Sequence, residues 1–421
     1  MPLELTAADR AMLDGEGGAA MQTAMSIVAQ MAEVQGAGEL LDITQAHIDA
    51  TVYVGDAGLE FAERLAGQGA KVAVPSTLNV GALDEHHWHE WAVAPEWAAR
   101  ARRQMHAYES MGTTPTWTCA PYQTVHRPTF GEHIAWGESN AVSFANSVIG
   151  ARTDFYADML DICCALTGRA PAAGLHLSEN RIGRLLLRLV GVPKKVQQDD
   201  SFFTVLGYVT GRMAGNRIPV VEGVLGEPDE DQLKALAATA ASSGAVAMFH
   251  IIGVTPEAPT CEAAFHGRRP EEILDITMDE LRRARCELTT ADGAQLDMVV
   301  LGSPHLSIGE IKRLLLLVEG KRAHPEVEFL VTTSRAVAHL AERSGAMECL
   351  RAFGARVTVD TCILTTPMLP EGVRVLMTNA GKFAYYTPGL LSREVVFSGM
   401  EDCVRSAIEG RVVVEDRLWK N

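Results

Sequence analysis

The sequence predicts an α/β protein whose several subdomains, with mainly parallel sheets, surround a central crevice. In the last third of the chain, four short apolar runs each end in a small polar cluster, and the runs cover residues 297–301, 328–331, 356–359 and 373–377. Helical patterns separate the first three runs. Strand, polar turn and helix in alternation are typical of a parallel sheet, whose ligands bind beyond the carboxyl ends of the strands. We therefore expect the four polar clusters to meet in one crevice.

These clusters carry hydroxyl, imidazole and thiol groups. They are Ser303-Pro304-His305, Thr333-Ser334-Arg335, Asp360-Thr361-Cys362 and Thr378-Asn379. Ser307 and Glu310 have the spacing of a capping box that starts a helix over residues 310–318. Ser303 and His305 therefore precede a helix amino terminus, which favours anions. The pattern predicts an enzyme site that contains a soft-metal ligand.

Length and composition narrow the class of protein. The 421 residues suggest two to three domains, and 47% apolar with 21% charged residues is ordinary for a folded globular chain. A net charge of -16 argues against nucleic acid or anionic membrane as a partner, because both require a basic face. The amino terminus lacks a basic region followed by an apolar core, and no apolar stretch is long enough to span a membrane. We expect a cytoplasmic protein.

The first third of the chain predicts one βαβ unit. Met21, Met25, Val28 and Met31 recur at helical spacing and predict a core stripe. After this helix, residues 40–43 and 71–75 read as strands that flank a helix over residues 59–65. The loops 46–49, 55–58 and 77–81 carry amide, hydroxyl and carboxylate groups, which suit a polar substrate.

Three clustered histidines at positions 86, 87 and 89 suggest a metal site, but their spacing is not the i, i+4 spacing of a helical zinc pair. We interpret them as surface or packing residues. The eight cysteines are too sparse for a disulfide framework. Cys119 stands out because Pro115 and Pro121 place it in a turn, where a thiol is presented rather than packed.

Two polar stretches follow, over residues 131–140 and 146–153. They include amide and hydroxyl groups together with Arg152, whose guanidinium group suits a small carboxylate substrate. A polar network that only joins helices is the alternative. Residues 155–167 then predict a helix with Cys163 and Cys164, which point about 100° apart, so that at most one of them faces a site.

A second α/β subdomain is predicted over residues 201–292. Residues 202–209, 219–224 and 245–254 look like strands and residues 229–241 like a helix, and His250 is interpreted as a core histidine. We therefore expect three subdomains: 1–200 with Cys119 and the substrate-binding loops, 201–292, and 293–421 with Cys362.

Several multi-residue motifs together resemble the aconitase X family, from about residue 4 to residue 410. The motifs are Leu41-Asp42-Ile43-Thr44-Gln45-Ala46-His47-Ile48-Asp49, Gly55-Asp56-Ala57-Gly58-Leu59-Glu60-Phe61, Thr118-Cys119-Ala120-Pro121-Tyr122, Asn146-Ser147-Val148-Ile149-Gly150-Ala151-Arg152-Thr153, Gly302-Ser303-Pro304-His305 and Asp360-Thr361-Cys362. This resemblance implies an aconitase-like large subunit with hydro-lyase activity. It implies either a cis-3-hydroxy-L-proline dehydratase, as in bacteria, or a mevalonate 5-phosphate dehydratase, as in archaea.

The resemblance also implies an iron-sulfur cluster, with Cys119 and Cys362 at the matching ligand positions. The archaeal pattern has a further cysteine where this chain has Ser303. This departure favours a two-iron centre and the hydroxyproline branch. The third protein ligand stays open between Cys163, Cys164 and a group other than a thiol.

Eliminating a β-hydroxyl group requires removal of an α-proton while a Lewis acid takes the hydroxide, and a cluster iron with an open position supplies that acid. For cis-3-hydroxy-L-proline, the product after tautomerisation is Δ1-pyrroline-2-carboxylate. The expected catalytic residues are Ser303, His305 and Lys382, and Cys163 is the third metal-ligand candidate beside Cys119 and Cys362. The expected substrate contacts are His47, Asp49, Gly55, Asp56, Asn79, Glu138, Ser139, Asn146, Ser147, Arg152 and Thr153.

In the family, a small swivelling domain completes the site, so we expect an aconitase-type small subunit as a partner that brings the general base. Three alternatives stay open: a mevalonate 5-phosphate dehydratase, a non-catalytic binding subunit, and a cluster-free metal hydrolase. The hydrolase would use carboxylates together with His47, His133, His176 and His305.

Overall fold

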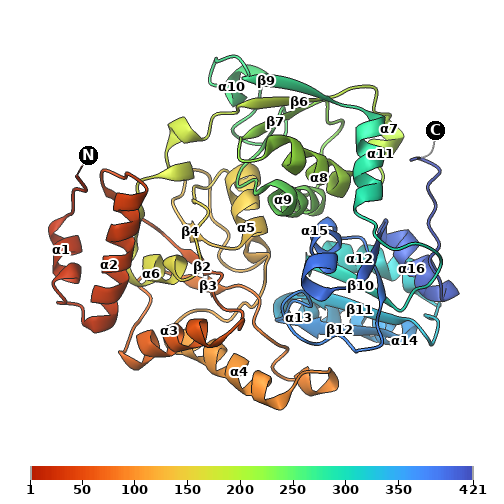
Figure 1. Ribbon diagram of the computed structural model, residues 1–421, viewed down its shortest axis with the longest axis horizontal. Coiled ribbons are helices and arrows are strands. Elements are labelled where there is room, and N and C mark those ends of the chain that lie inside the picture. The colour runs from red at the N-terminus through yellow and green to blue at the C-terminus, as the bar shows by residue number, and fades with distance from the viewer. Residues whose placement is uncertain (1, 420–421) are drawn as a thin grey trace.

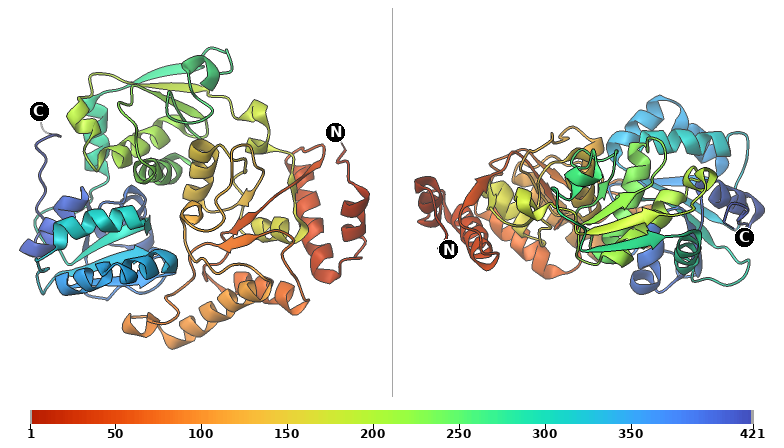
Figure 2. Two further views of the ribbon diagram at one scale, coloured as in Figure 1. Left: turned by 180° about the vertical axis from the view of Figure 1, so that it is seen from behind. Right: turned by 90° about the horizontal axis from the view of Figure 1, so that it is seen from above.

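The computed structural model describes residues 2–419 and shows three α/β domains in contact around the middle of the molecule (Figure 1). The first domain lies at one end of the longest axis and the third at the other, with the two chain ends far apart (Figure 2). The predicted fold class is confirmed. Among residues 2–419, no helix is both long and apolar enough to cross a bilayer.

The first domain has two small sheets surrounded by helices. Its helices are α1 (Ala7–Leu13), α2 (Ala19–Val34), α3 (Asp56–Gly67), α4 (Pro95–Ser110), α5 (Ser139–Phe144) and α6 (Leu160–Thr167), and its strands are β1 (Leu40–Asp42), β2 (Ala46–Ile48), β3 (Ser76–Leu78), β4 (Ala135–Trp136) and β5 (Arg169–Pro171). The parallel sheet has the order β3-β2-β4. Met25 and Val28 of α2 are fully buried, as the predicted core stripe requires.

The βαβ unit of this domain exists, but its strands differ from the predicted ones. They are β2 and β3, whereas the predicted strand over 40–43 became β1, which pairs antiparallel with β5. Residues 71–75 are not a strand, and the predicted loop around His47 is strand β2. Short, fully buried strands lack the alternation that reveals a half-exposed strand, so their boundaries were misplaced. Helix α6 likewise begins at Leu160 rather than at residue 155.

The second domain is a four-stranded parallel sheet with helices against it. Its elements are β6 (Leu185–Leu189), α7 (Lys194–Gln197), α8 (Phe202–Ala214), β7 (Pro219–Glu222), α9 (Glu230–Gly244), β8 (His250–Ile251), α10 (Cys261–Ala264), β9 (Glu272–Ile276) and α11 (Met278–Glu287). The strand order is β8-β7-β6-β9. Strand β6 precedes residue 201, the expected start of this subdomain, and it pairs with strands that follow that residue.

Residues 202–209 form the first part of helix α8, so the predicted strand there is wrong. Nearly every residue of α8 is buried, and a helix that is buried on all sides has a continuous apolar sequence that resembles an internal strand. The predicted strand over 245–254 is reduced to β8, a two-residue strand, and His250 in it is buried as expected.

The third domain is a five-stranded parallel sheet in the order β12-β11-β10-β13-β14. Its elements are β10 (Met298–Leu306), α12 (Ile308–Val318), β11 (Glu328–Thr333), α13 (Arg335–Arg343), α14 (Ala346–Phe353), β12 (Ala355–Val359), β13 (Val375–Thr378), α15 (Gly381–Tyr386), β14 (Glu394–Phe397) and α16 (Met400–Glu409). The four predicted strands are therefore present. Alternate residues of β10 face different cores: Val299 and Leu301 pack with α12, α14 and α16, and Met298 and Val300 pack toward the first domain.

Helices α8 and α9 approach each other closely through glycine. A Cβ atom on Gly244 would lie 1.9 Å from the carbonyl oxygen of Gly211, and one on Gly211 would lie 2.1 Å from the hydroxyl oxygen of Ser243. This contact matters for the site because α9 carries Lys234, whose ammonium group donates to the carbonyl oxygen of His305 in the third domain at 3.1 Å.

We expect Gly244→Ala to lower the free energy of unfolding by about 1–3 kcal/mol, since the added methyl group must push the two helices apart. Urea denaturation measures this loss. The matched control is Gly67→Ala in α3, where a Cβ atom meets nothing within 4 Å. That substitution should be neutral or stabilising by up to about 1 kcal/mol, so an equal loss in both variants would contradict the explanation.

Candidate active site

A cavity of about 420 Å³ lies where the first and third domains meet, at the carboxyl ends of the third-domain strands. Nine of the residues expected from the sequence line it together: Asp49, Asn79, Cys119, Glu138, Ser139, Ser303, His305, Cys362 and Lys382. The predicted convergence of Cys119 and Cys362, 243 positions apart in the printed sequence, is therefore observed.

An irregular end of β10 places Ser303 and His305 in the cavity. Between the pairs Leu301–Val331 and Leu306–Thr333, β10 has four residues where β11 has only Thr332. The extra residues leave the regular ladder at Gly302, which has φ +112°, and a Cβ atom there would lie 2.2 Å from the carbonyl oxygen of Thr332. Only glycine combines this backbone angle with so close an approach.

The two thiols come from opposite sides of the cavity. Cys119 follows Thr118 in the turn before Pro121, and its Sγ atom accepts a hydrogen bond from the backbone N–H of His305 at 3.3 Å. Cys362 follows strand β12 and the left-handed residue Asp360 (φ +63°), whose carboxylate is paired with Arg335. Burial raises the pKa of Cys119 to about 12 and also raises the pKa of Cys362. Both groups are thiols at neutral pH, so a metal that binds them as thiolates must displace two protons.

A buried ion pair joins the first domain to the third inside this cavity. Lys382 of α15 pairs with Glu138, and the Lys382 ammonium group also donates to the hydroxyl oxygen of Ser139 at 3.2 Å. Glu138 caps the amino terminus of α5, where it accepts from the backbone N–H of Ala141 at 2.7 Å. Burial opposes ionisation, but the charge of Lys382 keeps the pKa of Glu138 below its ordinary value. Glu138 in turn raises the pKa of Lys382 against the effect of burial.

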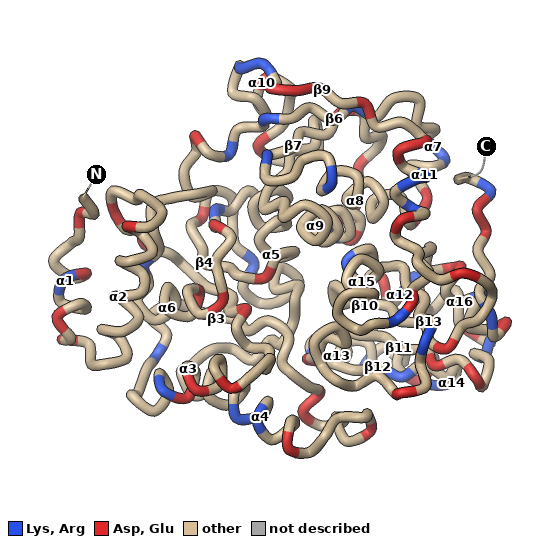
Figure 3. Tube along the Cα trace, in the orientation of Figure 1, with Lys and Arg blue, Asp and Glu red and all other residues tan. Residues whose placement is uncertain are grey.

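Three carboxyl groups form an acidic wall on the first-domain side, where Figure 3 shows acidic positions around β3 and the start of α5. Asp49 and Asp158 line the cavity, and Asp161 behind them accepts from the backbone N–H of Asp49. Burial, together with the neighbouring carboxylates, raises the pKa of Asp49 well above its ordinary value, and burial raises the pKa of Asp161 to about 7. Asn79 donates to the Asp49 carboxyl group. Asp49 is therefore held in place, and its surroundings favour the protonated carboxyl group over the carboxylate.

Sequence reasoning missed Asp158 and Asp161. The signal that could have found them is that both aspartates lie near the start of the otherwise apolar helix predicted over residues 155–167. That segment was interpreted only for its two cysteines.

Eight other expected site residues lie away from the cavity, so the expectation that they gather there needs correction. They are His47, Gly55, Asp56, Asn146, Ser147, Arg152, Thr153 and Cys163. His47 lies behind the wall, with Nδ1 2.8 Å from the Thr77 hydroxyl oxygen, and burial lowers its pKa to about 3. Gly55 and Asp56 begin helix α3, where Asp56 accepts from the Tyr53 hydroxyl at 2.8 Å. Cys163 is packed in the main apolar core.

The polar stretch over residues 146–153 joins the first and second domains instead. Asn146 bonds to Thr153 and to the backbone of Ala247, and the Ser147 hydroxyl oxygen accepts from Phe249 N–H at 2.8 Å. Arg152 donates to the carbonyl oxygen of His176 at 2.9 Å, a contact within the first domain. The alternative interpretation, a network that joins structural elements, describes these contacts.

The residues present fit a two-thiol iron site better than a three-cysteine site. Cys119 and Cys362 face one cavity, whereas Cys163 and Cys164 are buried elsewhere. Of the third ligands predicted from the sequence, only a group other than a thiol is therefore left. Among the described residues, no three His, Cys, Asp or Glu side chains are gathered as metal ligands. The four histidines of the alternative hydrolase do not gather either: His133 pairs with His176, and of the four only His305 is among the described residues that line the cavity. His86, His87 and His89 likewise form no metal site, and His87 lies beside Asp84.

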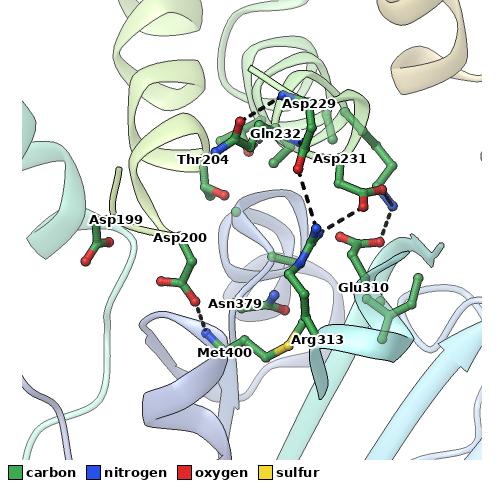
Figure 4. A pocket seen from close by; sticks show the side chains of 18 of the residues that line it. Asp199, Asp200, Thr204, Asp229, Asp231, Gln232, Glu310, Arg313, Asn379 and Met400 are labelled. Atoms are coloured by element: carbon green, nitrogen blue, oxygen red, sulfur yellow. Dashed lines mark hydrogen bonds and ion pairs between the residues drawn. The ribbon is translucent and has the colours of Figure 1, made fainter. Parts of the chain in front are cut away.

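A second cavity of about 610 Å³ lies next to the first, between α8 and α9 on one side and α12 and α16 on the other (Figure 4). The two cavities share Ser303 and Lys382. Several acidic side chains line the second cavity, and Asp229 and Asp231 among them are paired with Arg313. The described residues that line it include no cysteine, so we place the chemistry in the first cavity.

Comparison with known proteins agrees with this geometry. A cavity with two thiols, an ammonium group and carboxyl groups at the carboxyl ends of parallel strands is the site of an α/β enzyme. Models of the aconitase X first, second and third domains match residues 2–179, 183–286 and 296–409. The chain belongs to the aconitase X family.

Three relatives illustrate the similarity. A cis-3-hydroxy-L-proline dehydratase of Pseudomonas aeruginosa is 48% identical over 97% of this chain and 70% of the relative. The phosphomevalonate dehydratase large subunit of Methanothermobacter thermautotrophicus is 38% identical over 94% of this chain and 96% of the relative. The crystal structure of Thermococcus kodakaraensis aconitase X in its holo-form has a TM-score of 0.86 and 31% identity, and covers 96% of this chain and all of that one. The chain is accordingly a hydro-lyase.

We expect Lys382→Met to lower the free energy of unfolding at pH 7 by about 3–5 kcal/mol, because Glu138 would stay buried without its partner. The pKa of Glu138 is below its ordinary value of 4.5 in the folded protein, so its stabilising contribution exists above that pH and is lost as the pH falls through the folded-state pKa. Without Lys382 burial raises this pKa instead, so the difference between the wild type and Lys382→Met should shrink as the pH falls toward 4.5 and below. Urea denaturation across this pH range measures it.

The double variant Glu138→Gln/Lys382→Met is the control, since Gln keeps the acceptor for Ala141 without a charge. It should recover most of the lost stability. A double variant as unstable as the single one would show that the ion pair is not the cause.

Proposed function

We propose that this chain dehydrates cis-3-hydroxy-L-proline to Δ1-pyrroline-2-carboxylate. The observation that carries the proposal is the balance of charges in the cavity: Asp49, Glu138 and Asp158 face it, and Lys382 is the one Lys or Arg among the described residues that line it. An amino acid needs a cation for its carboxylate and an anion for its amine, and this cavity offers both. A phosphorylated hydroxy acid carries two strong anions and no cation, so it fits poorly.

The relatives support this choice. Those named cis-3-hydroxy-L-proline dehydratase, from Pseudomonas aeruginosa and Hypocrea jecorina, are 48% and 45% identical to the chain. Phosphomevalonate dehydratase large subunits are 33–38% identical. Phosphomevalonate dehydration is the second candidate function and rests on those more distant relatives alone.

Cys119 and Cys362 are the residues that would hold an iron-sulfur centre, with Ser303 as the neighbouring oxygen donor. When bound, such a centre supplies a Lewis acid for the departing hydroxide. A two-iron type agrees with the two thiols that face the cavity.

The chain's own groups hold the substrate. Lys382 binds the substrate carboxylate, and the hydroxyl of Ser139 lies beside its ammonium group. The Asp49 carboxylate accepts a hydrogen bond from the ring amine. Loss of the α-proton and of the 3-hydroxyl group as one water molecule leaves an enamine, which gains a proton at C3 and loses one at nitrogen to give the product.

We also propose that a small swivel-type subunit closes this cavity and brings the general base. Three exposed apolar side chains surround the cavity mouth: Val54, Phe155 and Leu390 are 79%, 45% and 58% exposed. Apolar side chains around a polar site are typical of a surface that another protein covers. The archaeal relatives are named as large subunits, which supports such a partner.

We also propose a cytoplasmic location. The eight free cysteines suit a reducing compartment, which supports this location.

The decisive experiment reconstitutes the chain with iron and sulfide under anaerobic conditions and adds the small subunit. We expect kcat/KM for cis-3-hydroxy-L-proline to exceed that for phosphomevalonate at least about 100-fold, and activity without the small subunit to be slight. Absorption and paramagnetic resonance spectra of the same sample test for the cluster and report its type. Faster turnover of phosphomevalonate would contradict the proposed substrate. Full activity of the chain alone would contradict the proposed role of the small subunit.

Substrate binding should release protons from Asp49. Burial and the neighbouring carboxylates raise the pKa of this group in the free chain, and a cationic amine beside it lowers that pKa again. We expect calorimetric titration with L-proline, which lacks the leaving hydroxyl group, to show proton release that depends on buffer ionisation enthalpy. Asp49→Asn should abolish that release and weaken binding about 10- to 100-fold. Asp14→Asn, an exposed acid on the far side of the first domain, is the control and should leave both unchanged.

A further inference from the structure

His305 contacts all three domains at once, although it is 2% exposed. Its ring Nδ1 lies 3.1 Å from the hydroxyl oxygen of Thr118 in the first domain, and its ring Nε2 lies 2.9 Å from the carbonyl oxygen of Thr361 in the third. Its own carbonyl oxygen accepts from the ammonium group of Lys234 in the second. Thr118 and Thr361 directly precede Cys119 and Cys362 in the chain. The ring therefore bridges the two segments that carry the thiols.

The hydrogen bonds determine the tautomer of the ring. A carbonyl oxygen only accepts, so Nε2 carries the hydrogen and donates to Thr361. Nδ1 is then an acceptor, and the Thr118 hydroxyl donates to it. The same hydroxyl oxygen accepts from the backbone N–H of Ala120 at 3.2 Å, which leaves its hydrogen free for the ring. Every polar atom of the bridge is thus used, and neither ring nitrogen is left to exchange a proton with a substrate.

The backbone of the same residue also acts on one of the thiols. Its N–H group donates to the Sγ atom of Cys119 at 3.3 Å. Such a bond stabilises a thiolate relative to a thiol, and it fixes the direction of the sulfur. The irregular end of β10 makes this possible, since His305 lies among the four residues that leave the ladder opposite Thr332.

We propose that His305 is a positioning residue that sets the spacing of Cys119 and Cys362 for a shared metal, and that it is not the acid or base of the reaction. This inference rests on the proposed function only in taking the two thiols as ligands. Groups that orient metal ligands through hydrogen bonds have this effect in many metal sites, where their loss weakens metal binding. Here one side chain orients both ligand segments.

The test uses Cd²⁺ and the full chain without cluster or substrate, under anaerobic conditions. In the parent protein, Cys261, Cys286 and Cys349 are replaced by Ser, because these are the described cysteines that are at least partly exposed away from the cavity. The thiolate charge-transfer absorption of Cd²⁺ then reports binding to the pair, and Cys119→Ser or Cys362→Ser in the parent should remove it.

Two partial variants separate the two halves of the bridge. We expect His305→Ala to bind Cd²⁺ about 10- to 100-fold more weakly than the parent. His305→Gln should be intermediate, because its amide N–H can replace Nε2 toward Thr361 while the Thr118 contact is lost. Thr118→Val, which removes the other contact and leaves the ring intact, should be intermediate too.

Circular dichroism and thermal unfolding check that each variant is folded. If His305→Ala does not fold, His305→Gln and Thr118→Val decide the outcome. Parent-like Cd²⁺ affinity in all folded variants would overturn the proposal. Failure of the hydroxyproline assay would not affect the proposal on His305, because no substrate or iron takes part in the Cd²⁺ test. If the chain proved inactive on hydroxyproline, loss of Cd²⁺ affinity in the His305 variants would still support the proposal.

Discussion

The ion pair between Lys382 and Glu138 is the interaction on which the cavity depends. It joins α15 of the third domain to the start of α5 in the first, and both side chains are largely buried. A buried pair of charges tolerates little change in geometry, because loss of either partner leaves an uncompensated charge. The pair therefore holds the two domains at a fixed distance on either side of the thiols. It also leaves Lys382 as the one Lys or Arg among the described residues that line the cavity, beside the carboxyl groups of Asp49, Glu138 and Asp158. This charge balance is the basis for preferring an amino acid over a phosphorylated substrate.

Around this pair, the site is assembled from the ends of strands and not from their regular parts. Four residues of β10 leave the ladder opposite Thr332, and Asp360 takes a left-handed conformation just after β12. These irregular segments carry Ser303, His305 and Cys362. Side chains of a regular strand stand roughly perpendicular to the sheet, so the irregular ends let these three side chains turn toward the cavity beyond the strands. The regular part of the sheet is a rigid support, and its irregular ends orient the site side chains toward the cavity.

Much of the third domain and its part of the site could be predicted from the sequence. Its four apolar runs each end in a recognisable polar cluster, so the strands and the convergence of Ser303 and His305 with Cys362 followed from topology. The expectation that all four clusters meet in one crevice is wrong, because residues 333–335 and 378–379 are not among those that line the cavity. In the first two domains, two- and three-residue strands and the almost fully buried helix α8 lack a clear period, and their assignments failed. The polar residues at 146–153 were assigned to the substrate because hydrogen-bonding groups in loops serve binding and packing equally well. Only the contacts of Asn146 and Ser147 show that this stretch joins domains.

By itself, the sequence determined the α/β class, the parallel sheet of the third domain, the family, and the two cysteines that share a cavity, because these depend on local pattern and on motifs that survive in order along the chain. The tertiary structure alone decided which polar groups face that cavity. It placed Asp158 and Asp161 beside Asp49, buried Cys163 and Cys164 in the core, and engaged both ring nitrogens of His305. The physical reason is that the charge, the protonation and the free hydrogen-bonding capacity of a side chain are set by neighbours that are distant in sequence, and those neighbours are known only once the domains have packed together.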